Sequence, residues 1–402
     1  MKKIVLITTG QPAGNPRIVK EADALQSAGY DVTVLYCFFI RWSSEKDKVL
    51  LKNVSWKYKL VGGSPDKDRW LYLFTRLRCK LASILLPYLK HRFLLAERTQ
   101  ARAFDELLRA AKEIKANWYI GHNLGALAVA VKAAGYHKAK AGFDFEDYHL
   151  GESGTEEKAA LKRISYLENR YLPSLMYVST SSDLISEATI SNHANFTRPV
   201  ITLRNCFPLS QQPAFNERPS GATLQLFWFS QTIGVNRGLE PLIRAMVILN
   251  DPGIHLTLAG RCDHEMLDFI SNNAGEIAAN IHFAGIIQPE ELPTFAAGFD
   301  IGLALETGFS RNNNIALSNK IFTYLLAGNA IILSETAMQL TFNKMYQVGE
   351  SFALNDEKEL AEKIRIYQNP QQLIAQKRHN YELAKAELNW EKESKILLGV
   401  IV

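Results

Sequence analysis

Two basic residues and one acid stand where predicted strands end in the second half of the chain. Arg237 follows an apolar strand predicted at 224–229, Glu306 follows one predicted at 301–305, and Lys320 lies in the first turn of a predicted helix. The carboxyl ends of parallel strands share one edge of a sheet, so these side chains are expected to converge there. Two fixed cations near a helix N-terminus can stabilise a departing diphosphate. The alternative roles are structural, with Arg237 capping a loop and Lys320 solvated.

The first half carries a second group of ionisable residues. His122 ends a predicted strand, and Asp144, Glu146 and His149 fall within six residues after another one. A neutral imidazole at a strand end can hydrogen-bond a sugar or orient a hydroxyl group, and a histidine buried in the core is the competing interpretation. No second cluster of ligands accompanies the two carboxylates and His149, so we expect no metal site.

The elements that must position these residues alternate between strand and helix. Residues 3–9 are apolar and β-branched, residues 10–17 hold a glycine loop, and a helical pattern then runs to Gly29. A buried strand at 30–36 completes a β–α–β unit, which requires parallel strands with helices over the sheet. The fold class is therefore predicted to be α/β. Further strands are predicted at 118–120, 141–143, 175–178, 200–203, 224–229, 255–259, 281–284, 301–305 and 330–333, and helices at 124–134 and 157–171.

A proline-rich loop divides the chain. Residues 208–221 contain three prolines and precede a new strand, which marks a domain boundary. We predict two doubly wound, Rossmann-like domains that face each other across a cleft. The first is 1–207, joined by a C-terminal helix at 385–402, and the second is 208–384. Residues 40–95 do not fit the alternation and are predicted to be an insertion in the first domain.

Within that insertion, apolar residues recur at helical spacing with Lys and Arg between them. Basic amphipathic helices of this kind lie on anionic membrane surfaces. Two interpretations follow: residues 69–95 make a peripheral membrane contact, or the helix packs one face on the core while its basic residues are solvated. The recurring apolar residues are Leu71, Phe74, Leu77, Leu81 and Leu85.

Charge is distributed unevenly along the chain. Residues 1–210 hold 31 Lys and Arg against 20 Asp and Glu, a net charge of +11, whereas the remainder has a net charge of −6. A basic first half suits an anionic ligand or surface. The chain lacks a recognition helix and an aromatic–basic RNA motif, so we expect no nucleic-acid partner.

The location is expected to be cytoplasmic. The first residues lack a signal-peptide pattern, and no apolar run reaches the ~20 residues of a membrane-spanning helix. The four cysteines form no CxxC pair, and we expect them to be reduced thiols.

Five segments of the second half occur in the order and approximate spacing found in a known family. They are 227–245, 256–260, 281–285, 300–306 and 319–332; the first contains Arg237-Gly-Leu and the last contains Asn319-Lys320-Ile-Phe-Thr-Tyr-Leu-Leu-Ala-Gly. This half resembles the donor-binding domain of GT-B glycosyltransferases, above all the retaining group 1, or family 4. The resemblance implies a nucleotide-diphosphate sugar bound by Gly234, Arg237, Glu306, Lys320 and Thr323.

The first half resembles the same family less specifically, and residues 40–95 do not share the likeness. Its glycine loop and the segments that follow two central strands correspond to parts that the family uses near the diphosphate and the acceptor. The resemblance therefore implies three sets of residues: His122, Arg237, Glu306 and Lys320 in catalysis, Gly14 at the donor, and Arg17, Asp144, Glu146 and His149 on the acceptor side.

Two positions depart from the family pattern. Thr323 stands where the family has a second glutamate for the ribose hydroxyls, and Thr232 stands where many members have arginine. Thr323 can offer only a weaker contact. A missing cation at the diphosphate could be supplied by Arg261 or Arg311.

The resemblance implies a retaining glycosyltransferase that moves a hexose-type sugar from a nucleotide diphosphate to a glycan, lipid-linked or other hydroxyl acceptor in surface polysaccharide or glycoconjugate synthesis, without a further cofactor. In this family the leaving diphosphate is held to deprotonate the acceptor, so no protein nucleophile is predicted. The enzyme then supplies positioning and charge stabilisation. One alternative is a non-catalytic GT-B binding or assembly protein, motivated by Thr232 and Thr323. The other is a basic nucleic-acid-binding protein, suggested by the charge of the first half.

Overall fold

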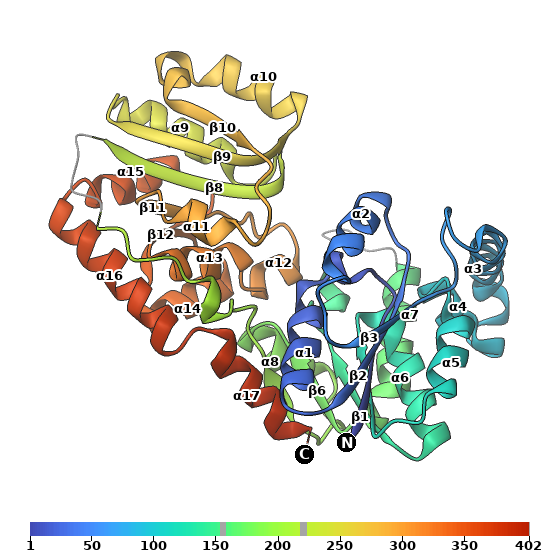
Figure 1. Ribbon diagram of the computed structural model, residues 1–402. Coiled ribbons are helices and arrows are strands. Elements are labelled where there is room, and N and C mark those ends of the chain that lie inside the picture. The colour runs from blue at the N-terminus through green and yellow to red at the C-terminus, as the bar shows by residue number, and fades with distance from the viewer. Residues whose placement is uncertain (153–157, 218–222, 402) are drawn as a thin grey trace. The chain divides into compact units, whose positions relative to one another are not determined.

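The computed structural model describes residues 1–152, 158–217 and 223–401, which form two compact units (Figure 1). Unit 1 comprises Met1–Leu203 together with the residues from Ser394 onward, and unit 2 comprises Arg204–Glu393. The division falls after Leu203, where the sequence had placed it after residue 207. Position 157 of the predicted helix 157–171, positions 218–221 of the predicted linker and position 402 lie outside the described residues.

Unit 1 is built on a seven-stranded parallel sheet in the order β3-β2-β1-β4-β5-β6-β7. The chain reverses its direction of winding between β1 and β4, as in other doubly wound sheets. The strands are β1 Lys3–Thr8, β2 Asp31–Cys37, β3 Lys57–Val61, β4 Trp118–His122, β5 Lys140–Asp144, β6 Tyr177–Thr180 and β7 Val200–Thr202. The helices are α1 Pro16–Ser27, α2 Arg41–Leu50, α3 Arg69–Leu89, α4 Leu95–Gln100, α5 Phe104–Glu113, α6 Leu124–His137, α7 Lys158–Tyr171 and α8 Asp183–Asn192.

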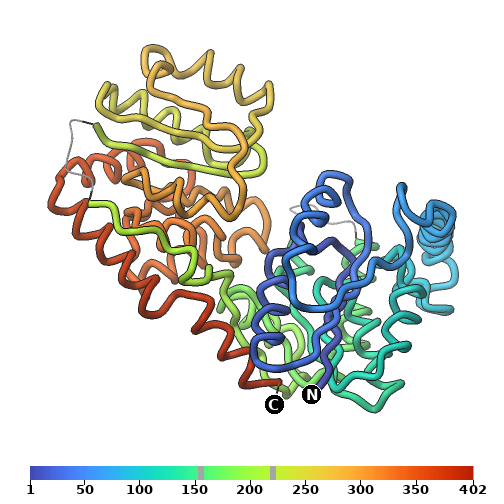
Figure 2. Tube along the Cα trace, viewed as in Figure 1, coloured from blue at the N-terminus to red at the C-terminus, as the bar shows by residue number. Residues whose placement is uncertain are grey.

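Both faces of the unit 1 sheet are covered by helices. Side chains alternate along a strand, so Val5 and Ile7 of β1 enter the core beneath α5 and α6, whereas Ile4 and Leu6 enter the core beneath α1. The last helix, α17 (Trp390–Val400), returns the chain to unit 1 (Figure 2). There the indole N–H of Trp118 donates to the carbonyl of Ile401 at 3.1 Å.

The segment 40–95 is not a single insertion. Strand β3 pairs in parallel with β2 at the edge of the sheet, in the register Thr33 to Lys57. Its sequence hides it, because an edge strand with one covered side needs no continuous apolar run, and three of its five residues are exposed. The segment also contains α2, α3 and the short helix Arg92–Leu94, and α4 begins at its last residue. No helix among the described residues is both long enough and apolar enough to cross a membrane.

Unit 2 is a six-stranded parallel sheet in the order β10-β9-β8-β11-β12-β13, with its own reversal between β8 and β11. The strands are β8 Leu224–Ile233, β9 Ile254–Cys262, β10 Ile281–Gly285, β11 Ile301–Ala304, β12 Ala330–Ser334 and β13 Gly349–Phe352. The helices are α9 Leu239–Leu249, α10 His264–Asn273, α11 Leu292–Ala296, α12 Arg311–Ile315, α13 Asn319–Ala327, α14 Ala337–Tyr346, α15 Glu357–Ile366 and α16 Pro370–Ala386. The predicted α/β class with two Rossmann-like domains is confirmed.

Candidate functional site

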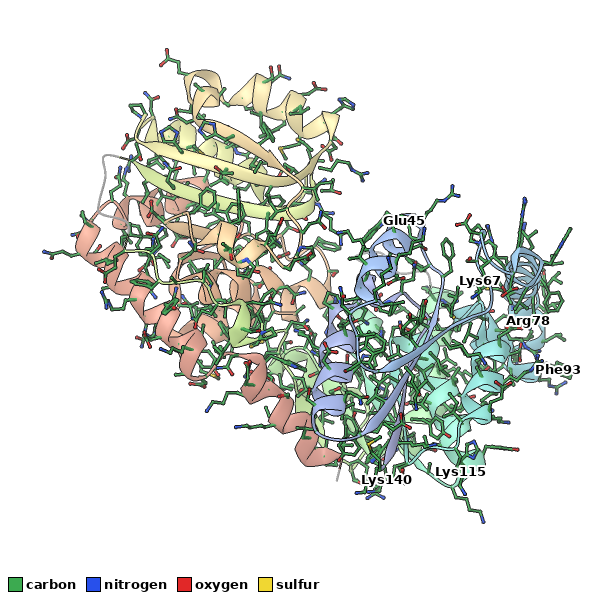
Figure 3. The ribbon with its side chains drawn as sticks, in the orientation of Figure 1. Glu45, Lys67, Arg78, Phe93, Lys115 and Lys140 are labelled. Atoms are coloured by element: carbon green, nitrogen blue, oxygen red, sulfur yellow. The ribbon has the colours of Figure 1, made fainter. Side chains whose placement is uncertain are left out.

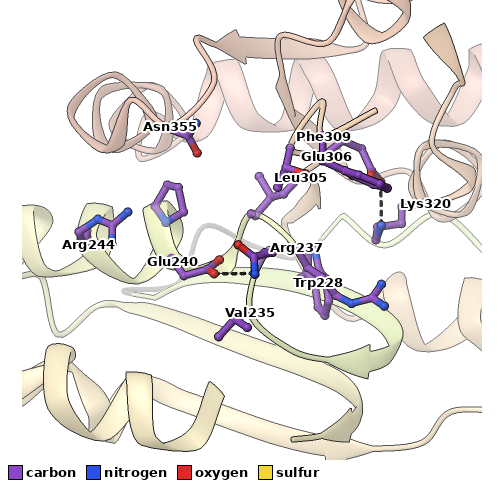
Figure 4. Close-up of a pocket in the computed structure, with 14 residues that line it drawn as sticks. Trp228, Val235, Arg237, Glu240, Arg244, Leu305, Glu306, Phe309, Lys320 and Asn355 are labelled. Carbon is purple, nitrogen blue, oxygen red and sulfur yellow. Dashed lines mark hydrogen bonds and ion pairs between the residues drawn. The ribbon is translucent and has the colours of Figure 1, made fainter. Parts of the chain in front are cut away.

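A pocket of about 830 Å³ lies in unit 2, where the loops after β8 and β11 meet (Figure 4). These two strands are neighbours and flank the point at which the sheet reverses, which is where open α/β sheets bind ligands. Arg237, Glu306 and Lys320, predicted from three separate segments, all line this pocket. Its complete lining is Trp228, Val235, Asn236, Arg237, Gly238, Glu240, Pro241, Arg244, Leu305, Glu306, Thr307, Phe309, Lys320 and Asn355.

The loop that carries Arg237 is held tightly against the end of β11. Gly238 has a φ of +80°, and a Cβ atom there would lie only 2.9 Å from the Cβ of Leu305. Any other residue would strain the backbone and push the two loops apart. The neighbouring Asn236 donates its backbone N–H to Glu240 Oε1 at 2.5 Å. Arg237 is thus carried on a fixed turn, and its exposed guanidinium donates to Ser230 Oγ at 3.3 Å.

Glu306 is the side chain most fully engaged by its neighbours in this pocket. Its Oε1 accepts hydrogen bonds from Ser318 Oγ at 2.8 Å and Lys320 Nζ at 3.0 Å, and its Oε2 accepts one from Asn313 Nδ2 at 3.0 Å. Burial alone would raise the pKa of Glu306, but the charge of Lys320 and these hydrogen bonds hold it below its usual value. Glu306 is therefore an ionised acceptor at neutral pH.

Lys320 lies at the N-terminus of α13, where the helix itself is positively polarised. The N-cap residue Ser318 turns its hydroxyl to Glu306 and does not cap the helix. The first-turn N–H groups of this nine-residue helix therefore lack a side-chain cap and favour an anion. The Lys320 ammonium also lies 5.6 Å from the centre of the Trp228 ring, a cation–π contact that fixes its position.

Three residues assigned to the donor by the resemblance do not line the pocket: Thr323 and Gly234 of unit 2, and Gly14 of unit 1. Thr323 is buried in α13, so it offers no hydroxyl to a ligand in this pocket. Gly234 precedes the pocket loop, and a Cβ atom there would lie 2.4 Å from Asp263 Oδ2. Its role in the structure is to allow that close approach.

A third cation of the pocket was missed in the sequence. Arg244 lines the pocket, whereas Arg261 and Arg311, suggested as substitutes, do not. Glu240 and Arg244 are four residues apart on α9 and so share one helix face. This helix begins directly after the Arg237 loop, so the helical spacing of the two residues could have indicated that Arg244 lines the pocket. Arg244 also lies 3.9 Å from Glu357 Oε2.

In unit 1 the corresponding reversal of the sheet is filled by charged side chains. Arg17 Nε and Nη2 each donate to the carboxylate of Asp144 at 2.7 Å, and Arg17 lies 3.7 Å from Glu21. His122 lies between the two acids, with Nε2 3.3 Å from Glu21 and Nδ1 3.6 Å from Asp144. We call Arg17, Glu21, His122 and Asp144 the buried quartet, because each is at most 1% exposed.

Mutual attraction fixes the charges of the buried quartet. Burial alone would lower the pKa of His122, but the carboxylates of Glu21 and Asp144 raise it to about 10. Burial would likewise raise the pKa of Asp144, and Arg17 and His122 hold it well below its usual value. His122 is therefore an imidazolium enclosed by protein. This geometry does not fit the neutral, ligand-facing imidazole expected from the sequence.

Glu21, His122 and Asp144 could by their spacing hold a metal ion, and they are the only such group of three found in the described parts of the chain. Arg17 donates two hydrogen bonds to Asp144 and occupies that carboxylate with a fixed positive charge. A cation in the same position would be repelled by the guanidinium. We therefore assign these residues to an internal ion network and not to a metal centre.

The other acceptor-side predictions lie around the buried quartet. Glu146 is half-buried with a φ of +51°, and burial together with Asp144 raises its pKa to about 7. His149 is buried, with Nδ1 3.5 Å from Glu168 Oε1. Burial would lower the pKa of His149, but Glu168 raises it. Gly14 is exposed in the short helix Pro12–Gly14 that precedes α1.

No protein-family model matches the chain, and no curated protein matches it significantly. Solved structures match over its full length. Alr3699/HepE of Anabaena in complex with UDP has a TM-score of 0.71 and 14% identity, covering 100% of this chain and 99% of its own. Sucrose-phosphate synthase from Thermosynechococcus elongatus has a TM-score of 0.70 and 13% identity, and the match covers 100% of this chain and 98% of the synthase chain. A glycosyltransferase from Rickettsia africae has a TM-score of 0.67 and 11% identity, again with 100% and 98% covered. What this chain shares with these proteins is the GT-B fold, two Rossmann-like domains in one chain.

Proposed function

We propose that the protein is a glycosyltransferase that binds a nucleotide-diphosphate sugar in the unit 2 pocket and transfers the sugar to a hydroxyl acceptor. One observation carries this proposal: Arg237, Glu306 and Lys320, which come from three separate motifs, line one pocket at the reversal point of the sheet. HepE, which shares the fold, binds UDP and UDP-glucose. This supports the same donor class here.

The pocket side chains divide the donor between them. The exposed guanidinium of Arg237 and the ammonium of Lys320, beside the uncapped end of α13, would hold the diphosphate. Glu306, ionised and accepting, would take hydrogen bonds from the sugar hydroxyls. Arg244 adds a further positive charge to the lining. These side chains supply the charge stabilisation that we propose in place of a metal ion.

Retention of configuration is the stereochemical course we propose, on the strength of the motif order that resembles the retaining group 1. The bond from the anomeric carbon to the diphosphate oxygen breaks, and the acceptor oxygen bonds to the same face of that carbon. The acceptor proton passes to an oxygen of the leaving diphosphate. The protein then needs no nucleophile of its own, and its residues position the reactants and stabilise the departing charge. The acceptor is held by the basic unit 1, and a glycan or lipid-linked acceptor of polysaccharide or glycoconjugate synthesis is the class proposed.

The test begins with the full chain and a panel of nucleoside diphosphates and their sugars. One diphosphate at ~100 times its Kd is expected to stabilise the fold by about 2.7 kcal/mol, measured as a rise in Tm. Chromatography should then show that the matching nucleotide sugar is consumed when an acceptor is present. If no nucleotide binds, the proposal is wrong. Binding without turnover would favour the alternative of a non-catalytic GT-B protein.

A paired substitution tests whether the pocket is the nucleotide site. Arg244→Ala is expected to weaken nucleotide affinity by ~10-fold or more, because a hydrogen bond to a charged group is worth roughly 1.5–3 kcal/mol. Arg261→Ala, which removes an exposed arginine outside the pocket lining, should leave the affinity unchanged. Equal affinities in both variants would place the nucleotide elsewhere.

A further inference from the structure

Helix α3 carries an apolar surface that the rest of the described chain leaves uncovered. The five residues whose spacing indicated an amphipathic helix, Leu71, Phe74, Leu77, Leu81 and Leu85, are between 37% and 57% exposed. One face of α3 does pack on unit 1, as one of the two interpretations expected, but these five residues do not form it. The exposed apolar residues of α3, which we call the α3 strip, are Trp70, Leu71, Leu73, Phe74, Leu77, Leu81, Ile84, Leu85, Tyr88 and Leu89.

The opposite face of α3 attaches the helix to unit 1 and holds the α3 strip outward. Thr75 and Ala82 are buried on that face. The rings of Tyr72 and Phe38 pack edge to face with their centres 5.6 Å apart, and the Arg102 guanidinium lies 4.7 Å from the centre of the Tyr72 ring. Arg78 donates to both oxygens of Glu106, at 3.0 and 2.5 Å. These contacts fix the orientation of the helix without using its apolar side.

The charged side chains of helix α3 itself and of the turn after it have one sign. Between residues 69 and 96 the chain has six Lys and Arg and no Asp or Glu. Among the described residues, no carboxylate forms an ion pair with Arg69, Arg76 or Lys80. Lys67, just before α3, and Phe93, just after it, lie beside α3 in unit 1 (Figure 3). An apolar strip bordered by unpaired cations is complementary to a surface of acyl chains beneath anionic headgroups.

We propose that the α3 strip docks unit 1 onto the surface of a bilayer that contains anionic lipids. The apolar side chains enter the boundary between headgroups and acyl chains, while Arg69, Arg76 and Lys80 remain at the headgroup level. Trp70 and Tyr88, near the two ends of the helix, are 85% and 80% exposed and are residue types that favour this interface. The helix lies on the membrane and does not cross it.

The experiment measures co-sedimentation of the full chain with vesicles, which needs neither donor nor acceptor and is therefore independent of the proposed function. Vesicles of phosphatidylcholine with about 30% phosphatidylglycerol provide the anionic surface, and pure phosphatidylcholine provides the neutral one. The chain is expected to bind the anionic vesicles at least ~10-fold more tightly than the neutral ones, and less tightly at high salt. Failure to bind anionic vesicles overturns the proposal.

Substitutions within the α3 strip separate docking from a general surface effect. Phe74→Glu with Leu77→Glu should lower binding to anionic vesicles by at least ~10-fold, because two apolar anchors are replaced by like charges. The matched control is Val49→Glu with Tyr136→Glu, which changes two apolar residues of α2 and α6 that are 65% and 64% exposed. Circular dichroism must show that both variants remain folded. An equal loss in the control overturns the proposal.

The cations are tested in the same way. Arg69→Ser with Lys80→Ser should weaken binding to anionic vesicles by roughly fivefold for each charge removed, and leave binding to neutral vesicles unchanged. Lys52→Ser with Lys115→Ser, which removes two exposed lysines outside α3, serves as the control.

A second copy of this chain is the other molecule that could cover the α3 strip, and sedimentation velocity measures whether the chain is a dimer. If Phe74→Glu with Leu77→Glu converts a dimer to a monomer and the wild type ignores anionic vesicles, the strip is a subunit interface and the proposal is wrong.

Lys320→Ala tests whether docking is independent of the unit 2 pocket. This change is in unit 2, outside the α3 strip, and should leave vesicle binding at the wild-type level. In the wild type, vesicle binding without nucleotide turnover would retain the docking surface and remove the proposed function. Turnover without vesicle binding would do the reverse.

Discussion

The two units place charged residues at the same point of the same topology and use them in opposite ways. In unit 2 the reversal between β8 and β11 leaves a pocket, lined by three cations and two carboxylates. In unit 1 the reversal between β1 and β4 is occupied by the buried quartet, two cations and two acids that balance each other. Conserving a topology therefore does not conserve an open site.

The difference arises from the direction in which the arginine side chains point. In unit 1, Arg17 in the first turn of α1 turns inward and donates hydrogen bonds to Asp144 and to the carbonyl of Leu203. In unit 2, the turn held by Gly238 keeps Arg237 outside the core, where its guanidinium makes a long hydrogen bond to Ser230. The first arrangement stabilises a fold, and the second leaves charge available for a ligand.

The largest expected effect is on the stability of unit 1. Asp144→Asn should lower the free energy of unfolding by ~3–5 kcal/mol, because Arg17 and His122 lose the charge that compensates their burial. Chemical unfolding followed by circular dichroism measures this loss. The control is Asp66→Asn, which breaks an exposed pair with Arg41 and should cost less than ~1 kcal/mol. A similar small cost for Asp144→Asn would mean that the quartet is not structural.

The second effect concerns the pocket of unit 2 and appears in activity. Lys320→Ala should reduce kcat for sugar transfer by ~10²–10³-fold, the usual cost of removing one group that stabilises transition-state charge. Its Tm should change little, because Lys320 is partly exposed and its main partner is one carboxylate. Lys344→Ala, at an exposed lysine of α14, is the control for charge loss. A near-normal kcat in Lys320→Ala would contradict the view that unit 2 keeps this charge available for a ligand.

The smallest effect is a pH dependence in unit 1. The pKa of Glu146, raised from 4.5 to about 7, means that the folded chain binds more protons than the unfolded chain between these values. Stability therefore falls as pH rises from 4.5 to 7, by less than about 1.4 kcal/mol per pH unit. Glu146→Gln should remove this fall, measured by urea unfolding at several pH values. The decline above pH 6.5 due to His122, whose pKa is about 10, should remain. Parallel curves for the wild type and the variant below pH 6.5 would contradict the prediction.

Much of the fold could be predicted from the sequence, because the buried parallel strands are apolar runs with short connections. The convergence of Arg237, Glu306 and Lys320 in one pocket was also predictable, since parallel strands bring their carboxyl ends to one edge. The accessibility of these side chains to a donor stays a prediction. Strand β3 was missed because an edge strand tolerates the polar sequence Lys-Tyr-Lys.

The buried quartet could not be predicted, because its members pair over long distances in sequence. Arg17 and Asp144 are 127 residues apart, and Glu21 had no motif to mark it. Spacing along the chain indicates which residues share a helix face or a strand end, but does not show whether a charge there is balanced by a distant partner. For that reason His122 looked like a ligand-facing residue until its two carboxylate neighbours were visible.

The ion pair between Lys320 and Glu306 must be broken by any anion that binds the Lys320 ammonium directly. Small anions such as free phosphate must compete with an internal counter-ion for the ammonium, and would leave Glu306 without its cationic neighbour. A molecule that offers a phosphate to Lys320 and hydroxyl donors to Glu306 replaces both halves of the pair in one step. If the protein acts as proposed, this exchange of partners would favour the intact sugar nucleotide over its fragments.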